Sequence, residues 1–376
     1  MYIDREDWDP LKQSPKNIYK KKSKRVNEQL NRIRVGLHEY LIRHADKTIS
    51  HAKIQAYIYR IGKQKNKYAK GTLLAYMTDY IESKAHIVSP TTLKRYHVFL
   101  KLIARFEGYS MKRYTLKEVC ASYVRQFLKF GKLEGYSTST LYRTIHFVRT
   151  ILLFLEKRGV RTYFYELDLP KMSKKGKITT LSEKELMRIK QTEVGSNLRA
   201  AKDWLIISCY TGQRISDFIN FSTDQLQVIE GRTCISFEQQ KTKKSILLPL
   251  HPTVMHILKR NNNKFPPKIS AQSYNKQIKE IARIAGLDIE INLRRREQHR
   301  VVSISGPKWQ AMTSHIGRRS FASNFYGKIP TALLMEATGH SSERMFLRYV
   351  NQVDTQRTVA LSKYLEEVYQ TRTQLI

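Results

Sequence analysis

The sequence is poor in cysteine, and its three cysteines, Cys120, Cys209 and Cys234, stand far apart without C-x-x-C spacing. Isolated thiols of this kind are typical of a reducing cytoplasm and argue against both a disulfide framework and a zinc site. We interpret each as a small apolar residue of a core. No apolar run is long enough for a membrane helix, and the first residues, "MYIDREDWDP", lack the apolar stretch of a secretion signal. We therefore expect neither membrane insertion nor secretion.

Acidic residues are also scarce, because 32 Asp and Glu stand against 68 Lys and Arg, which leaves a formal charge of +36. Such an excess repels itself in a compact chain unless a polyanion neutralises it, so nucleic acid is the expected partner. Binding of this kind weakens steeply with salt, since phosphate contacts release counterions. A basic structural protein is the alternative. The 376 residues, 41% of them hydrophobic, suffice for two or three folded domains.

Residues 1–70 are expected to form a basic segment with one helix. From Asn27 to Ile42 apolar residues recur at roughly helical spacing. The preceding run "KNIYKKKSKR" is a solvated basic stretch that is able to follow a phosphate backbone. The polar stretch from Gly62 to Gly71 fits a linker and a DNA-contacting turn equally well.

Residues 71–166 carry several amphipathic patterns with basic flanks, which predict a small helical bundle that binds DNA. The last of these patterns stops at Gly159, a typical helix end. Most aromatic residues here are expected in the core, among them Phe99, Phe147 and Phe154. Four basic residues on the predicted helices are candidates for DNA contact: Lys94, Arg95, Arg143 and Arg149.

A flexible basic linker is expected at residues 167–180, where a proline, a glycine and several lysines interrupt the apolar pattern. A second domain, residues 181–376, opens with Ser182 three positions before Glu185, which is a capping-box signature of a helix start. An apolar helix follows, then two strands around a lysine-rich turn, Thr233 to Glu238 and Ser245 to Leu250, and then helices again. We therefore predict a mainly α-helical protein with one small β-hairpin.

Four short pieces of the second domain contain the residues of greatest chemical interest. They are "TGQRISDF" with Arg214, "QQKTKKSILLPL" with Lys241, "HIGRRSFAS" with His315 and Arg318, and "TGHSSERMFLRYVN" with His340 and Tyr349. Taken singly, each has a structural explanation: a solvated arginine after a helix, a surface lysine, a core histidine or a core tyrosine. Their joint order and local context favour a common site.

These residue types together fit chemistry on a phosphodiester. Arg214 and Arg318 are able to grip nonbridging oxygens with paired donors, which a lysine does not imitate. Charge placed where the transition state develops is usually the largest catalytic contribution. Tyr349 is then the nucleophile, forming a phosphotyrosine bond. Since no metal-binding set accompanies them, we expect cationic side chains to replace Mg²⁺ and no cofactor to be needed.

The second domain resembles the tyrosine recombinases, also called phage-type integrases. Their signature is TG-x-R-I-S-[DE], a lysine on a β-hairpin, H-x-x-R, G-H-S and a tyrosine nine residues beyond, and this sequence has all five in that order. The resemblance covers residues 180–370 strongly, and the bundle is similar, more weakly, to the SAM-like core-binding domain of the family. It implies a site-specific DNA recombinase that cuts and rejoins strands through a 3′-phosphotyrosine link, in integration, excision or inversion.

The resemblance also supports roles for the other polar residues of the site. Lys241 is our candidate general acid for the leaving 5′-hydroxyl, with Lys243 and Lys244 as alternatives, because a slip in the hairpin would exchange them. His315 is expected to handle a proton or donate a hydrogen bond near the phosphate. His340 is expected to donate to a nonbridging oxygen or to Tyr349.

Two further residues are expected beside these groups. Asp217 fits the acidic position after the arginine and is expected to orient its neighbours, although a surface helix carboxylate fits equally well. Arg319 stands where the family often has a histidine, and we expect it to support the site without touching the phosphate.

The two ends of the chain carry expectations about partners. The N-terminal segment looks like the remnant of a module that binds arm sites, and arm binding is doubtful because no clear strands precede its helix. Residues 353–370 form an amphipathic pattern that fits a helix docked on a neighbouring subunit of a tetramer, or one folded back on its own domain. The expected partners are double-stranded DNA at a specific site and further copies of the chain, in a prokaryotic cytoplasm or nucleoid. A type IB-like topoisomerase and a non-catalytic DNA-binding protein are the alternative functions.

Overall fold

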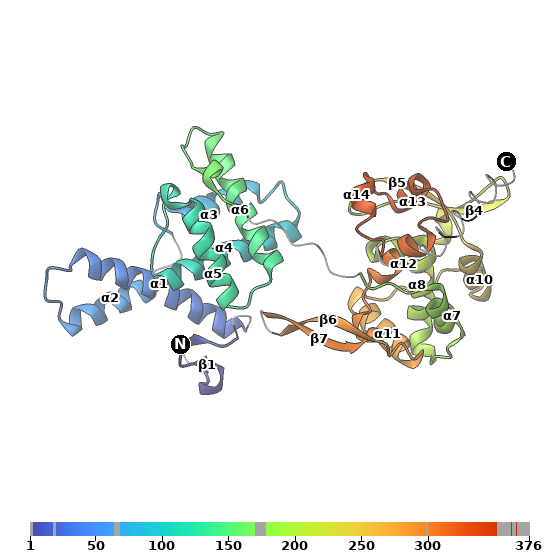
Figure 1. Ribbon diagram of the computed structural model, residues 1–376, viewed down its shortest axis with the longest axis horizontal. Helices are drawn as coiled ribbons and strands as arrows, with labels where there is room; N and C mark the ends of the chain where they lie inside the picture. Colours follow the sequence, from blue (N-terminus) through green and yellow to red (C-terminus); the bar gives the residue numbers. More distant parts are fainter. Residues whose placement is uncertain are drawn as a thin grey trace. The chain divides into compact units, whose positions relative to one another are not determined.

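The computed structural model of the chain describes residues 3–17, 20–63, 68–169, 178–297, 300–351, 362 and 366. The chain divides into two compact units, chiefly Met1–Ser173 in the first and Lys174–Leu293 with Ile304–Ile376 in the second. Helices dominate both units, and the strands of the described residues form three small sheets (Figure 1). The mainly helical fold class predicted from the sequence is confirmed.

The first unit is a bundle of helices with very little β-structure. Its helices are α1 Lys21–Arg43, α2 His51–Lys63, α3 Leu73–Lys84, α4 Pro90–Ser110, α5 Ala121–Leu133 and α6 Thr138–Glu156. Two short strands, β1 Trp8–Asp9 and β2 Ser14–Pro15, pair ahead of α1, and single 3₁₀ turns lie at Arg5–Asp7, Leu116–Glu118 and Phe164–Glu166. Helices α3 to α6 fall within residues 71–166, where the sequence predicts the bundle.

Capping side chains fix where several of these helices start. The hydroxyls of Thr72, Ser89 and Ser137 each accept a hydrogen bond from a backbone N–H in the first turn of α3, α4 and α6. Of the aromatic residues predicted in the core, Phe99 and Phe147 are buried, and Phe154 packs against the same core while partly buried. The expected helix stop is also present, because α6 ends at Glu156 and Gly159 follows with a φ of 78°.

Helix α1 is longer than its apolar pattern predicts, because it begins at Lys21, inside the basic run. Lysine and arginine are good helix formers, so a run of them does not end a helix. α1 packs along α4, where Asn31 lies directly on Gly108, and along α2, where Ile61 lies on Gly36. The N-terminal segment is therefore part of the same compact unit as the bundle.

Helix α2 has no counterpart in the sequence-based prediction. It extends into the stretch from Gly62 to Gly71, which we interpreted as a linker or a turn, while residues 64–67 of that stretch lie outside the described residues. Its apolar residues recur at Ile54, Ile58 and Ile61, a spacing typical of a helix. The polar and basic residues between them hide this pattern.

The second unit is built around helix α8, Ser196–Thr211, whose apolar residues are buried on nearly every side. The other helices are α7 Glu183–Gln191, α9 Ile215–Phe218, α10 Pro252–Arg260, α11 Ala271–Ile284, α12 Ile316–Phe325, α13 Thr331–Thr338 and α14 Glu343–Phe346, with 3₁₀ turns at Thr223–Gln225 and Lys308–Ala311. Helices α10, α11 and α12 pack against α8. The end of α8 and the start of α12 thus lie close together, which matters for the site.

The small β-hairpin predicted from the sequence is present, and the structure has more β-structure than predicted. The predicted strands exist as β4 Arg232–Glu238 and β5 Ser245–Pro249, but β3 Leu226–Ile229 adds a third strand beside β4. A second hairpin, β6 Glu290–Glu297 and β7 Arg300–Pro307, follows α11 and precedes α12 along the chain (Figure 1). A two-stranded hairpin has little core to face, so its strands lack a regular apolar alternation, and Arg294 and Arg295 on β6 are exposed.

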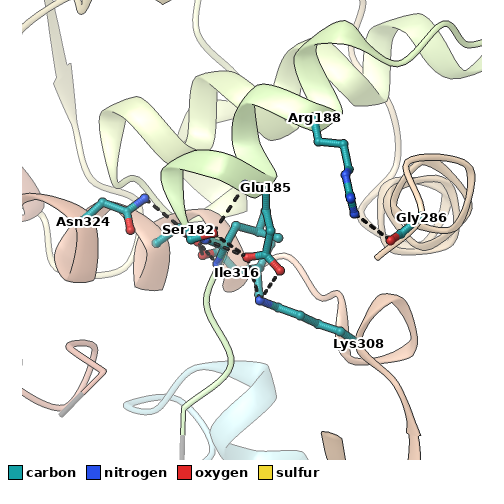
Figure 2. A network of polar contacts seen from close by, with 9 residues as sticks. Ser182, Glu185, Arg188, Gly286, Lys308, Ile316 and Asn324 are labelled. Carbon is teal, nitrogen blue, oxygen red and sulfur yellow. Dashed lines mark hydrogen bonds and ion pairs between the residues drawn. The ribbon is translucent and has the colours of Figure 1, made fainter. Parts of the chain in front are cut away.

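The entry into the second unit is tied to helix α12. Ser182 and Glu185 form the predicted capping box of α7, and Lys308 Nζ lies 2.6 Å from Glu185 Oε1 (Figure 2). The backbone N–H of Leu181 donates to the hydroxyl of Ser320 on α12 at 2.8 Å. These contacts hold α12 against α7. Most of the predicted linker at residues 167–180 lies outside the described residues.

The predicted C-terminal docking helix, residues 353–370, lies outside the described residues apart from Ser362 and Glu366. None of the helices in the described part of the chain has the length and apolar character needed to cross a membrane. The three cysteines are free thiols, and Cys209 and Cys234 are buried as expected, while Cys120 is partly exposed.

Candidate active site

Arg214 lies on a tight turn where α8 gives way to α9. Gly212 ends α8 with a φ of 67°, and a side chain at this position would collide with Phe321 and Thr338. The backbone carbonyl of Arg214 accepts the first hydrogen bond of α9, from Asp217 N at 2.8 Å. The predicted location, a glycine-containing turn at the end of an apolar helix, is thus what the structure has.

Arg318 is the central charged group of the site. It projects from α12, its side chain is fully buried, and its Nη1 and Nη2 donate to the backbone carbonyls of Gly212 at 3.0 Å and Thr338 at 2.6 Å. Its Nε has no hydrogen-bond partner within the described residues. Burial, followed by the nearby charge of Arg214, lowers the pKa of Arg318 from its usual value, while Tyr349 and Asp217 act in the opposite direction. A buried cation with an unused donor is suited to an incoming anion.

His340 lies beside Arg318 as a neutral ring. Arg318 Nη2 lies 3.1 Å from His340 Nε2, and because a guanidinium only donates, Nε2 is the acceptor there. The proton then sits on Nδ1, which lies 2.8 Å from the hydroxyl of Thr338. Burial, with Arg318, Arg214 and Lys244 adding to it, lowers the pKa of His340 to about 3. His340 thus contacts Arg318 and Thr338 here, and its role as a donor to a nonbridging oxygen or to Tyr349 stays a prediction.

Tyr349 lies one turn after helix α14, with its ring against both of these residues. The Arg318 guanidinium carbon is 5.3 Å from the centre of the Tyr349 ring, and the ring centre of His340 is 5.0 Å away. Ser323, also on α12, donates from its hydroxyl to the Tyr349 carbonyl at 3.4 Å. Helix α12 therefore holds both the buried arginine and the tyrosine.

His315 immediately precedes α12 and keeps an exposed edge. Its partial burial lowers its pKa, and four cations lower it further: Arg319, Arg318, Arg214 and Lys241. Arg319 itself is half-buried, and burial lowers its pKa while Tyr349 acts in the opposite direction. His315 is therefore a neutral base at the rim of a cationic site, with Arg319 beside it.

The three candidate lysines are all exposed on the turn between β4 and β5. Lys243 adopts the left-handed conformation with a φ of 55°, and its ammonium lies 3.4 Å from Glu238. The charge of Lys241 lowers the pKa of His315, and that of Lys244 lowers the pKa of His340. The charges of Lys241 and Lys244 are thus near enough to act on the two histidines, while Lys243 pairs with Glu238.

Asp217 is buried, which removes the alternative of a surface helix carboxylate. Its Oδ1 accepts a hydrogen bond from the backbone N–H of Gln240 at 3.0 Å, at the start of the lysine turn. The other oxygen, Oδ2, has no partner among the described residues. Asp217 therefore orients the lysine turn, in line with the prediction that it orients its neighbours.

The sequence-based prediction missed a set of buried polar residues that surround these groups. Gln213, Gln239 and Thr338 are fully buried, and Thr242 contacts Gln239 from the turn. Gln213 occupies the open position of TG-x-R, and Gln239 precedes Lys241 by two positions. No charge or periodicity singles them out. Among the described residues, no three His, Cys, Asp or Glu side chains gather as a metal site requires.

The DNA-contact candidates of the bundle lie in the first unit, apart from this set. Lys94 and Arg95 on α4 and Arg143 on α6 are exposed, and Arg149 on α6 is half-buried. Arg95 and Arg143 line a groove of about 1060 Å³ that helices α1 and α4 border. The groove also carries Lys24, Arg60 and Lys101, and most of its charged lining residues are basic.

Comparisons with known proteins agree with this architecture. Residues 178–357 match the phage integrase family, and residues 72–153 match the phage integrase SAM-like domain. A search of curated proteins finds no match.

Three solved structures are similar to the chain. A lambda integrase dimer bound to a COC′ core site is 18% identical over 79% of this chain and 85% of that one, with a TM-score of 0.55. The XerH site-specific recombinase bound to a palindromic difH substrate, in a post-cleavage complex, is 19% identical over 90% and 97%, with a TM-score of 0.56. The Tn1549 transposon integrase in complex with circular intermediate DNA is 13% identical over 79% and 100%, with a TM-score of 0.57.

At these identities the solved structures show the shared fold, while the two sequence matches cover both the bundle and the second unit. The chain belongs to the phage integrase family and is a site-specific DNA recombinase of the tyrosine type.

Proposed function

We propose that this chain cuts and rejoins DNA with Tyr349 as the nucleophile, in the site formed by Arg214, Arg318, His315, His340 and Lys241. The observation that carries the proposal is the state of Arg318. Its guanidinium is fully buried, keeps an Nε donor without a partner in the described residues, and lies against the ring of Tyr349. In a DNA recombinase, the anion for such a donor is the scissile phosphate of the DNA.

The two arginines bind the nonbridging oxygens of the scissile phosphate. The planar guanidinium presents paired donors that match two phosphate oxygens, and here the backbone carbonyls of Gly212 and Thr338 orient one of the two groups. Negative charge gathers on these oxygens in the transition state, so fixed cations stabilise it more than the ground state. His340, neutral at physiological pH, keeps Arg318 in position.

Cleavage then proceeds by a single displacement at phosphorus. Tyr349 Oη forms a bond to phosphorus while the bond from phosphorus to the 5′ oxygen breaks. The phenolic proton passes to His315, which is neutral because its pKa is lowered. The 5′ oxygen takes a proton from Lys241, so the products are a 3′-phosphotyrosine and a free 5′-hydroxyl. Attack of another strand's 5′-hydroxyl on this link reverses the step and joins the strands.

The partners follow from the same chemistry. The substrate is double-stranded DNA at a specific site, with phosphate contacts from the bundle through Lys94, Arg95, Arg143 and Arg149. The lambda integrase relative was crystallised as a dimer on its core site. Strand exchange joins two such sites, so we propose a tetramer in which residues 353–370 dock on a neighbouring copy, working in the cytoplasm beside the chromosome.

The test is covalent capture on a suicide duplex, a nicked DNA that loses its short 5′-hydroxyl strand after cleavage. Its site is first selected from random-sequence duplexes by binding to the full-length protein. Wild type should form a covalent protein–DNA adduct and Tyr349→Phe none, while the matched control Tyr165→Phe, exposed in the first unit, should behave as wild type. An adduct from Tyr349→Phe would show that another residue is the nucleophile. Relaxation of plasmid without the selected site would favour topoisomerase activity.

A further inference from the structure

Two buried glutamines connect the parts of the site. Gln213 follows the end of α8, and Gln239 follows β4; both side chains are fully buried. Gln239 Nε2 donates to Gln213 Oε1 at 3.1 Å and to the Thr338 carbonyl at 3.1 Å. Gln213 Nε2 donates to the carbonyls of Thr211 at 2.9 Å and Ala337 at 2.7 Å. Every amide hydrogen of the pair thus has an acceptor.

The oxygen of Gln239 is the acceptor that faces the reacting groups. Its Oε1 accepts from Arg214 Nη1 at 3.0 Å and from the hydroxyl of Thr242 at 2.6 Å. Arginine has no acceptor and a backbone carbonyl has no donor, so only one orientation of the Gln239 amide satisfies these four contacts. In the reversed orientation the Gln239 NH₂ group would face the N–H donors of Arg214, and its oxygen would face the Thr338 carbonyl oxygen. The side chain is therefore locked in one direction.

Gln239 reaches three groups that the reaction requires at once. Arg214 binds it directly, and Thr242 lies next to Lys241 on the same turn. The Thr338 carbonyl accepts from both Gln239 and Arg318, so the second arginine is linked through a shared atom. Gly339 lies so close to Gln239 that a side chain there would collide with the amide. The cluster leaves little room for Gln239 to move alone.

We propose that Gln239, held by Gln213, is a positioning residue that sets Arg214 and the lysine turn as one unit. It thereby assembles the grip on the phosphate and the protonation of the leaving 5′ oxygen together. The inference rests on the proposed roles of Arg214 and Lys241. Gln239 itself touches neither the phosphate nor the leaving oxygen; it acts through the donors that it fixes.

The chemistry of the leaving group separates this role from a merely structural one. A duplex in which sulfur replaces the bridging 5′ oxygen releases a thiolate, which needs no proton from a general acid. A variant that misplaces only the lysine turn therefore cleaves the sulfur duplex normally. A variant that misplaces Arg214 remains slow on both duplexes, since the phosphate charge is unchanged.

Three variants of the full-length protein are compared on suicide duplexes with the bridging oxygen or sulfur. Thr242→Val removes one hydrogen bond at an exposed position, and Gln239→Leu removes the amide. Gln227→Leu, an exposed glutamine on β3 of the same sheet, is the matched control. Single-turnover adduct formation is the measurement, and melting temperatures identify any loss of folding.

Thr242→Val should slow cleavage of the oxygen duplex about tenfold and leave the sulfur duplex unaffected, because general acid catalysis alone contributes about 10²–10⁴-fold. Gln239→Leu should slow cleavage of the oxygen duplex at least about 100-fold. On the sulfur duplex the loss should be smaller, about tenfold, because only the misplacement of Arg214 still slows cleavage there. Gln227→Leu should match wild type on both. Equal losses on both duplexes for Thr242→Val and Gln239→Leu, or no loss for Thr242→Val, would overturn the coupling to the lysine turn.

A separate variant distinguishes failure of the inference from failure of the proposed function. Lys241→Ala should be slow on the oxygen duplex and near wild type on the sulfur duplex if Lys241 is the general acid. If Lys241→Ala is equally slow on both, the proposed role of Lys241 is wrong, and the inference falls with it. If Lys241→Ala shows the sulfur rescue and Thr242→Val and Gln239→Leu do not, the inference alone is wrong.

Discussion

Both units of this recombinase bury polar groups, but they treat them in opposite ways. In the first unit, Glu107 and Tyr123 lie within an aromatic core formed around Phe106, and burial raises the pKa of Glu107 to about 8 and that of Tyr123 as well. Both groups are therefore neutral at physiological pH. In the second unit, Arg318 is buried as a cation and held by carbonyls.

The difference shows which unit is satisfied by its own residues and which one needs a ligand. A neutral group costs far less to bury than a charge, so the bundle is stable without a ligand, although the Tyr123 hydroxyl has no hydrogen-bond partner among the described residues. A buried charge with an unused donor is satisfied only when an anion arrives, which makes the second unit dependent on its substrate. Three changes test this contrast, and they are given in order of decreasing effect.

The largest effect is expected from Arg318→Lys. A lysine keeps the charge but does not reach Gly212, Thr338 and the phosphate together, so cleavage should fall at least about 1000-fold. DNA binding should stay nearly unchanged, because one phosphate contact among many is altered. Adduct formation on the suicide duplex and binding by fluorescence anisotropy are the two measurements. The control is Arg188→Lys, whose exposed guanidinium contacts the Gly286 carbonyl (Figure 2). Cleavage within tenfold of wild type would contradict the role of Arg318.

A smaller effect, on stability, is expected from Glu107→Gln. Burial raises the pKa of Glu107 to about 8, with Glu39 and Glu118 acting in the same direction and the N–H of Tyr114 and the charge of Arg113 against it. Between the ordinary carboxyl value of 4.5 and about 8, the folded chain keeps a proton that the unfolded chain has released. Stability of the wild type should therefore fall as pH rises through this window.

The glutamine variant has no proton to lose, so its melting temperature should be flatter over the same range. At pH 8 it should melt about 5 °C or more above wild type, as followed by circular dichroism. Glu28→Gln is the control, because Glu28 is only partly buried and pairs with Lys101. An unchanged pH slope in Glu107→Gln would mean that Glu107 is ionised in the folded bundle.

The smallest effect is expected at the basic groove of the first unit. Arg95→Ala and Arg143→Ala should each weaken DNA binding at low salt by less than about tenfold and lower the salt slope by about 1. Anisotropy titrations over a range of KCl concentrations measure both quantities. Lys129→Ala, exposed on α5 away from the groove lining, is the control. Equal slopes for all three variants would place the DNA elsewhere on the bundle.

The ionisable residues of the site were predictable from the sequence because their chemistry is recognisable in short motifs. Arg214, Arg318, His340 and Tyr349 stand in patterns whose order indicates the reaction. The structure brings Arg318, His340 and Tyr349 into contact and links Arg214 to Arg318 through Gln239 and the Thr338 carbonyl. The sequence determined less well which hairpin lysine is the general acid, since three lysines share one turn. The ion pair between Lys243 and Glu238 favours Lys241 and Lys244 as the general acid, which no motif indicates.

The neutral residues and the small strands were not predictable in the same way. Gln213 and Gln239 are ordinary polar residues in sequence, and only the fold shows that they meet across 26 positions. Helix α2 and the β6–β7 hairpin lack clean apolar periodicity, because each carries many charged or polar residues. In both cases the structure depends on contacts between distant segments, which local patterns do not record.

The paired glutamines also carry a consequence for how this sequence is able to diverge. Replacing Gln213 alone would leave a buried donor of Gln239 without its acceptor, and replacing Gln239 alone would leave the buried Oε1 of Gln213 without its donor. Variants that keep activity should therefore replace both positions together, by a second hydrogen-bonded pair that still offers an acceptor to Arg214. Once related sequences are compared, the two positions are expected to covary.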